Sequence, residues 1–156
     1  MNWPISELDD VRRLRALHAA LPGTLLSETV VPADFDRIWA ELSDLEHSFL
    51  NYTPSITSIQ ITERNGERMR AQVRDRIGLR ALFEVVLRSG WCLMQSRYVV
   101  FGMAAARTGE GTRVGYLLGL RLPGMRLYGR LLTPLLQPIG GSIMRGFSRR
   151  WTEHHE

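Results

Sequence analysis

The chain of 156 residues contains no lysine, and all 20 of its basic residues are arginine. The use of arginine in place of lysine throughout the chain is a property of the overall composition and marks no particular site. The formal net charge of +4 is spread along the sequence, whereas nucleic-acid-binding domains carry their charge in a stripe or patch. We therefore expect no nucleic acid partner.

Cysteine is almost absent. Cys92 is the only one, which excludes an internal disulfide and favours a reducing compartment. The first residues have neither the basic nor the apolar segment of a secretory signal. The longest apolar stretch, residues 98–106, is far shorter than the roughly 18 residues that cross a bilayer. We expect a cytoplasmic protein without a transmembrane helix.

Motifs for metal or nucleophilic chemistry are missing too. His18 and His47 stand alone, the pair at 154–155 lies at the end of the chain, and Cys92 has no cysteine partner. There is no Gly-x-Ser-x-Gly elbow and no glycine-rich phosphate loop before a helix. We expect no metal ion and no cofactor.

The composition that is present, 44% hydrophobic and 23% charged, is that of one globular domain. Apolar residues at helical spacing predict an amphipathic helix over residues 5–21, which Pro22 and Gly23 end. A strand is expected over Thr24–Val31, a helix over residues 35–42, and a shorter helical piece over residues 45–52 that ends at Pro54.

After Pro54 the period changes from 3.6 to 2. Apolar residues alternate with arginines over residues 68–77, which predicts a strand with one buried and one solvated face. The preceding strand, residues 56–63, joins it in a hairpin. Of two registers, we favour a three-residue loop with a bulge, which places Ile61 opposite Ala71 and Ile59 opposite Val73.

Further strands are expected over residues 79–88, 91–107 with a break near 96–98, and 112–122. Ser89 and Gly90 form a tight two-residue turn between the first two. Beyond Pro123 and Gly124 the pattern is helical, with interruptions at residues 134, 138 and 140–141 that indicate either a kink or a late start of the main helical segment.

Three short segments carry a resemblance to a known family. Residues 31–44 resemble the strand-to-helix entry of the START-like superfamily of polyketide cyclases, dehydrases and lipid-transfer proteins, residues 52–56 its next corner, and residues 111–114 the start of its last strand. The resemblance implies a bacterial α+β protein of the helix-grip fold, in which a curved antiparallel sheet wraps around a long C-terminal helix and encloses a hydrophobic cavity. An amphipathic extension, residues 1–23, would precede a START-like domain of residues 24–156.

Alternation places four polar residues on the concave face: Asp75, Ser96, Tyr98 and Tyr116. A carboxylate there is costly unless it is paired or wet, so Asp75 is either a buried group or a solvated residue at the strand end. The two tyrosines are either ordinary core aromatics or hydrogen-bond donors to a ligand. Asp75, Tyr98 and Tyr116 are thus the catalytic candidates if the protein is an enzyme.

We expect the protein to bind or transport a hydrophobic small molecule, such as a lipid, isoprenoid or polyketide-like compound. A cyclase, aromatase or dehydrase using the same cavity is the alternative, and an interaction module with a filled interior is the third. The binder is favoured because no acid–base pair emerges at a defined spacing. The residues expected to line the site are Met69, Val73, Phe83, Val85, Met94, Ser96, Tyr98, Tyr116, Leu118, Ile143, Met144 and Phe147.

The outer sheet face carries a second apolar surface formed by Leu82, Val86, Trp91 and Leu93. A surface of this kind is normally covered. The N-terminal helix and a second subunit in a homodimer are the two candidates. Arginines in and around the C-terminal helix form either a solvated helix face or a surface for transient contact with a membrane; they are Arg126, Arg130, Arg145, Arg149 and Arg150.

Overall fold

The computed structural model of the protein describes residues 9–120. These residues form an α-helix, a strand, a second α-helix, a short 3-10 helix and then six consecutive strands. The elements are α1 (Asp10–Ala20), β1 (Thr24–Val31), α2 (Phe35–Ser43), η1 (Ser48–Tyr52), β2 (Ile56–Asn65), β3 (Arg68–Asp75), β4 (Arg80–Arg88), β5 (Trp91–Gln95), β6 (Val99–Thr108) and β7 (Gly111–Leu120). The helix expected after Gly124 lies outside the described residues.

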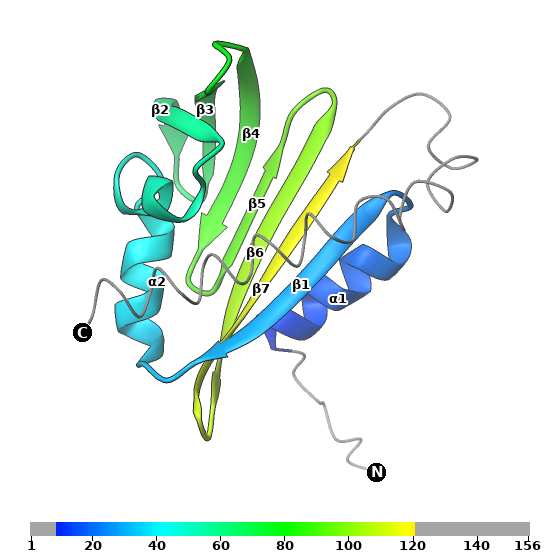
Figure 1. Cartoon of the computed structure of the whole chain (residues 1–156), viewed down its shortest axis with the longest axis vertical. Coiled ribbons are helices and arrows are strands. Elements are labelled where there is room, and N and C mark those ends of the chain that lie inside the picture. The colour runs from blue at the N-terminus through cyan, green and yellow to red at the C-terminus, as the bar shows by residue number, and fades with distance from the viewer. Residues whose placement is uncertain (1–8, 121–156) are drawn as a thin grey trace.

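The seven strands form one antiparallel sheet in the order β1-β7-β6-β5-β4-β3-β2. Strands β2 to β7 are a meander of hairpins, and β1 pairs with the last of them. Because β1 and β2 lie at opposite edges, the chain crosses between them through α2 and η1. The sheet curves, and Figure 1 shows α2 and η1 beside the β2 edge and α1 behind β1 and β7.

Helix α1 packs on the outer, convex face of the sheet. It begins after Asp9, whose carboxylate accepts a hydrogen bond from the Arg12 backbone N–H at 2.8 Å. Its apolar side forms a cluster with β6 and β7 around Val11 and Leu14. Trp91 and Leu93 pack against this cluster, so the expectation that the N-terminal helix covers part of the outer apolar surface is confirmed for these two residues.

Helix α2 and η1 pack on the inner, concave face. The spacing of Phe35, Ile38, Trp39 and Leu42 gives α2 one apolar side, and all four are buried. They join inward side chains of the sheet in the larger of the two apolar clusters. The concave face is therefore closed at this edge by helical residues.

The β2–β3 register agrees with the prediction, although the turn differs from it. Ile61 lies opposite Ala71 and Ile59 opposite Val73. The turn itself has two residues between Asn65 and Arg68, and the extra residue sits in a bulge between Ile61 and Glu63. The bulge shifts the register by one and so keeps the isoleucines on the concave face.

Strand β3 ends earlier than alternation predicted, which corrects the placement of Asp75. One oxygen of the Asp75 carboxylate accepts hydrogen bonds from the backbone N–H groups of Ile77 (3.0 Å) and Leu79 (2.9 Å). Gly78, with φ of 86°, supplies the left-handed residue that this turn requires. Asp75 thus holds the β3–β4 turn and does not face the apolar interior, and Ile77 is 81% exposed.

The two following turns fall close to the predicted places. Arg88 pairs with Trp91, so the β4–β5 turn has the two residues expected. Strand β5 ends at Gln95 and β6 starts at Val99. Tyr98 lies in the bend between them and is 50% exposed, so its predicted inward position is wrong.

Candidate functional site

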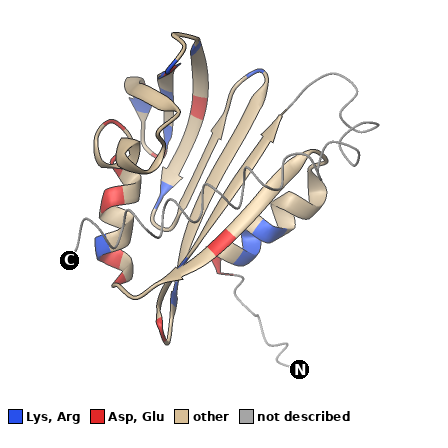
Figure 2. Ribbon diagram, in the orientation of Figure 1, with Lys and Arg blue, Asp and Glu red and all other residues tan. Residues whose placement is uncertain are grey.

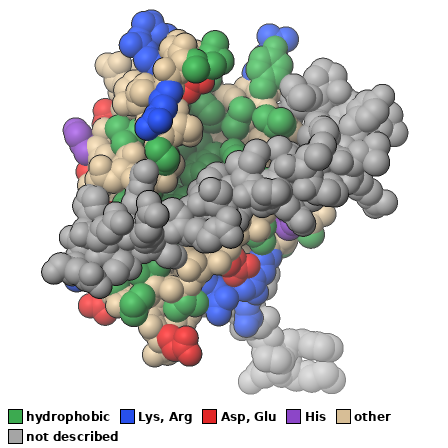
Figure 3. Space-filling view, in the orientation of Figure 1, with side chains coloured by type: hydrophobic (Ala, Val, Ile, Leu, Met, Phe, Trp, Pro, Cys, Tyr) green, Lys and Arg blue, Asp and Glu red, His purple; other side chains and the backbone are tan. Residues whose placement is uncertain are grey.

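The concave face of the sheet carries a continuous apolar surface drawn from neighbouring strands. Alternation turns every second residue inward, and the register places Met69 beside Val85 and Val85 beside Met94 across three strands. Figure 3 shows hydrophobic side chains lining the hollow of this face. The cluster contains these inward sheet residues: Met69, Ala71, Val73, Phe83, Val85, Cys92, Met94, Met103, Ala105, Val114 and Tyr116.

An aromatic row joins η1 to the far strands across this surface. The ring centroids of Phe49 and Phe101 are 5.7 Å apart, and those of Phe101 and Tyr116 are also 5.7 Å apart, each pair tilted. Tilted pairs at this distance are favourable arrangements of aromatic quadrupoles. The row therefore forms a rigid apolar wall that reaches from η1 to β7.

Two tyrosine hydroxyls supply polarity within the cluster. The Tyr52 hydroxyl donates a hydrogen bond to the Glu41 carboxylate of α2. Burial, together with this bond, raises the pKa of Tyr52. Burial also raises the pKa of Tyr116, and the nearby Tyr52 and Cys92 raise it further. Both hydroxyls are therefore protonated at neutral pH.

Cys92 lies on the same face and is completely buried. Burial raises the pKa of its thiol to about 12. The thiol is therefore a small apolar filler at neutral pH and not a nucleophile.

The structure brings together six of the predicted lining residues, namely Met69, Val73, Phe83, Val85, Met94 and Tyr116. Leu118 is partly buried two residues beyond Tyr116 on β7. The predicted residues Ile143, Met144 and Phe147 lie outside the described residues.

Ser96 takes a structural part at the β5–β6 bend. Its hydroxyl oxygen accepts a hydrogen bond from the Val99 backbone N–H at 3.0 Å. With Asp75 and Tyr98 also placed in turns, three of the four polar residues assigned inward by alternation lie at strand ends. Only Tyr116, in the middle of a long strand, has the position that alternation predicted.

Sequence reasoning missed Tyr52 and Glu41. The signal for Tyr52 was its spacing of three from Phe49, since residues three apart eclipse each other on a 3-10 helix and so share one face. Phe49 and Tyr52 are both buried. No local signal identifies Glu41, because its contact joins two helical segments that only the tertiary fold brings together.

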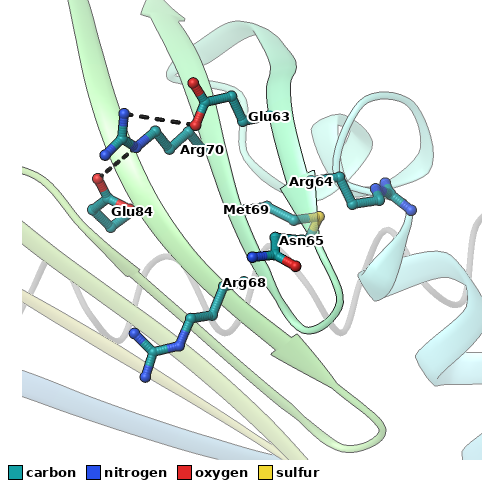
Figure 4. Close-up of a pocket in the computed structure, with 7 residues that line it drawn as sticks. All are labelled: Glu63, Arg64, Asn65, Arg68, Met69, Arg70 and Glu84. Atoms are coloured by element: carbon teal, nitrogen blue, oxygen red, sulfur yellow. Dashed lines mark ion pairs between the residues drawn. The ribbon is translucent and has the colours of Figure 1, made fainter.

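A pocket of about 470 Å³ at the β2–β3 turn has a different character (Figure 4). Among its lining residues, the Arg70 guanidinium forms ion pairs with the carboxylates of Glu63, at 3.6 Å, and Glu84, at 3.0 Å. These charged groups pair with one another and make the lining of the pocket polar. A polar lining does not suit an apolar ligand. Within residues 9–120 no three His, Cys, Asp or Glu side chains are grouped so that they could hold a metal ion.

Comparison with known proteins identifies the fold. No protein-family model matches the chain, and no curated protein sequence does. Solved structures match well. A START superfamily protein from Mycobacterium smegmatis is 15% identical with a TM-score of 0.55, over 85% of this chain and 96% of that one. The protein TTHA0849 from Thermus thermophilus is 20% identical with a TM-score of 0.57, over 85% of this chain and 99% of that one.

A third structure is the di-domain aromatase/cyclase StfQ of the steffimycin biosynthetic pathway. It is 12% identical with a TM-score of 0.62, over 93% of this chain and 55% of that chain. Likeness at such identities is a statement about the fold. In residues 9–120 the chain has the α+β fold of these START-like structures, with a curved antiparallel sheet, as the resemblance implied. The long C-terminal helix that the resemblance also implies falls outside these residues.

Proposed function

We propose that the protein binds a hydrophobic small molecule, such as a lipid, isoprenoid or polyketide-like compound, against the concave face of its sheet. The observation that carries the proposal is the continuous apolar surface contributed by β3, β4, β5 and β7, with the hydroxyls of Tyr52 and Tyr116 as its polar groups. A largely apolar site with a few placed polar groups is the usual chemistry of small-molecule binding. Likeness to a START superfamily protein and to StfQ supports it.

The experiment that tests this function compares two neighbouring positions of β4. Phe83 is buried on the concave face, and Leu82 is 57% exposed on the outer one. Binding of an apolar fluorophore to the folded protein is measured for the wild type, Phe83→Trp and Leu82→Trp. Extra bulk inside an enclosed site is unfavourable by about 1–3 kcal/mol, so Phe83→Trp should change the fluorophore affinity about tenfold or more, while Leu82→Trp leaves it unchanged.

A filled interior predicts a different result. The folded wild type would then take up no fluorophore, and neither substitution would alter that. Native mass spectrometry of the purified protein gives an independent check, since a binder should carry over an apolar molecule from the expression host. A protein without one, and without probe uptake, would be an interaction module and not a carrier.

A cyclase or aromatase is the second candidate, and the hydrogen bond between Tyr52 and Glu41 favours it. A buried hydroxyl beside a carboxylate can pass a proton to or from a reactive chain held on the apolar face. Asp75 has no place in this candidate because its carboxylate is engaged in the β3–β4 turn. With a poly-β-ketone chain as substrate, Tyr52→Phe should lower turnover by about a hundredfold while fluorophore binding is retained. A carrier shows no cyclised product with either protein.

The setting of the protein is also part of the proposal. We place it in the cytoplasm, in keeping with its single buried cysteine. Leu82 and Val86 lie outside the cluster that α1 covers, so a homodimer through the outer face would use them. Sedimentation of the wild type and of a Leu82→Ser variant distinguishes such a dimer from a monomer.

A further inference from the structure

One end of the sheet exposes large hydrophobic side chains. Because alternate turns of an antiparallel meander lie at the same end, the β3–β4 turn and the β5–β6 bend are both found there (Figure 1). Within residues 9–120 the exposed large hydrophobic side chains all belong to these two turns or to strand segments near this end. They are Ile77 (81% exposed), Leu79 (64%), Leu82 (57%), Tyr98 (50%) and Leu120 (37%).

Arginines surround the same two turns. Arg76 and Arg80 flank Ile77 and Leu79 on the β3–β4 turn, and both are exposed. On the β5–β6 bend the guanidinium carbon of Arg97 lies 5.4 Å from the centre of the Tyr98 ring. In the part of the chain that the structure describes, none of these three arginines forms an ion pair with a carboxylate. Figure 3 shows hydrophobic and basic side chains together at both turns.

The one carboxylate within the β3–β4 turn, that of Asp75, offsets part of the charge of Arg76 and Arg80, and the turn keeps a net positive charge. Asp75 directs an oxygen to the backbone N–H groups of Ile77 and Leu79. It therefore fixes the loop in a shape that projects both apolar side chains. We call residues 76–80 and 97–98 together the apolar-basic end.

The opposite end of the sheet provides a contrast. The β2–β3 hairpin there also carries two exposed arginines, Arg64 and Arg68, and neither forms an ion pair with a carboxylate of residues 9–120. Its neighbouring hydrophobic residue, Met69, is buried, at 4% exposure. Basic charge thus occurs at both ends, but exposed large hydrophobic groups accompany it only at the apolar-basic end of the described chain.

We propose that the apolar-basic end docks on the surface of an anionic lipid bilayer. Ile77 and Leu79 enter the boundary between headgroups and acyl chains, the arginines contact lipid phosphates, and Tyr98 lies at the headgroup level. The charge complements an anionic surface. Narrow projecting turns can enter a bilayer, whereas they offer little of the flat area that a stable protein interface buries. The docking does not depend on the concave face, so it is separate from the proposed ligand binding.

The test measures co-sedimentation of the full chain with phosphatidylcholine vesicles and with phosphatidylcholine vesicles that contain phosphatidylserine. The wild type should bind the second kind far better. Arg76→Gln with Arg80→Gln removes two charges and should weaken that binding about thirtyfold, since each basic residue near an anionic surface contributes about 1 kcal/mol. Ile77→Ser with Leu79→Ser should weaken it about tenfold or more, also at high salt, where the charge contribution is screened.

Arg64→Gln with Arg68→Gln is the matched control, because it removes the same charge from the opposite end and should leave binding within about twofold of the wild type. Circular dichroism verifies that each variant is folded, as expected for exposed positions. Three results would overturn the proposal. The first is equal binding of the wild type to both kinds of vesicle. The second is an effect of the control as large as that of the arginine pair at the apolar-basic end, and the third is self-association that Ile77→Ser with Leu79→Ser abolishes without any vesicle binding.

Discussion

The two halves of the sheet differ in how many of their faces are covered. Strands β6 and β7 have α1 on the outer face and the larger apolar cluster on the inner one. Strand β3 is covered on the inner face only, and its exposed positions are mostly arginines. Figure 2 shows the consequence, since charged positions lie on β2–β4 and near strand ends while the middle of β5–β7 has none. A strand with one covered face shows alternating apolar and polar residues, whereas a strand with both faces covered shows a continuous apolar run.

Glycine distinguishes the halves as well. A Cβ on Gly102 would lie 3.0 Å from one terminal carbon of Leu14, and a Cβ on Gly115 would lie 3.1 Å from the other. These two glycines, on neighbouring strands β6 and β7, let α1 approach the sheet closely. A glycine within an apolar strand is thus a mark of the covered half.

The largest effect is expected when the cover itself is weakened. Leu14, on the side of α1 that faces the sheet, is fully buried, and Leu14→Ala should lower the free energy of unfolding by about 2–5 kcal/mol. Leu82 on the outer face of the other half is 57% exposed, so Leu82→Ala should change it by less than about 0.5 kcal/mol. Urea denaturation measures both. Equal losses at the two positions would contradict the division of the sheet into a covered and an open half.

A second prediction concerns the inner face, which is covered in both halves. The pKa of Cys92 is raised to about 12 by burial, from a value of 9.0 without it. Folding therefore favours the protonated thiol. Its contribution to stability is complete below pH 9 and declines as the pH rises from 9 towards 12. At pH 8 a thiol reagent should label the folded protein orders of magnitude more slowly than the urea-unfolded protein. Rapid labelling of the folded protein would mean that this part of the concave face is open.

The hairpin order of β2 to β7 and the facing of most residues could be predicted because both follow from local patterns. Period-2 alternation assigned Met69, Phe83 and Met94 to the same face, and the turn residues Ser89 and Gly90 fixed the register between β4 and β5. The structure agrees with each of these assignments.

Other features of the candidate site could not be predicted in this way. Alternation does not show where a strand ends. Asp75, the last residue of β3, and Tyr98, which lies between β5 and β6, were therefore assigned inward, although hydrogen bonds to side chains turn the chain at both places. The contact between Glu41 and Tyr52 depends on how α2 and η1 pack. Periodicity within either segment contains no information on that packing.

The smallest effect is expected at the ion pairs of the outer face, where Figure 2 shows an acidic position of β1 beside basic positions of α1. Glu28 accepts two hydrogen bonds from Arg15, at 2.7 and 2.5 Å, and lies 3.7 Å from Arg113. This bidentate arrangement raises the pKa of Arg15. Because both arginines are partly exposed, Glu28→Gln should lower the free energy of unfolding by only about 0.5–1 kcal/mol, and less in high salt.

Glu84→Gln on the open half is the matched control for this substitution. Glu84 pairs with Arg70 at 3.0 Å, but its side chain is 65% exposed, against 20% for Glu28. Exposed pairs contribute close to nothing, so this variant should unfold at nearly the wild-type urea concentration. If the two substitutions had the same effect, the ion pair would add nothing to the docking of α1, and the covered half would be held by apolar contacts such as those of Leu14 alone.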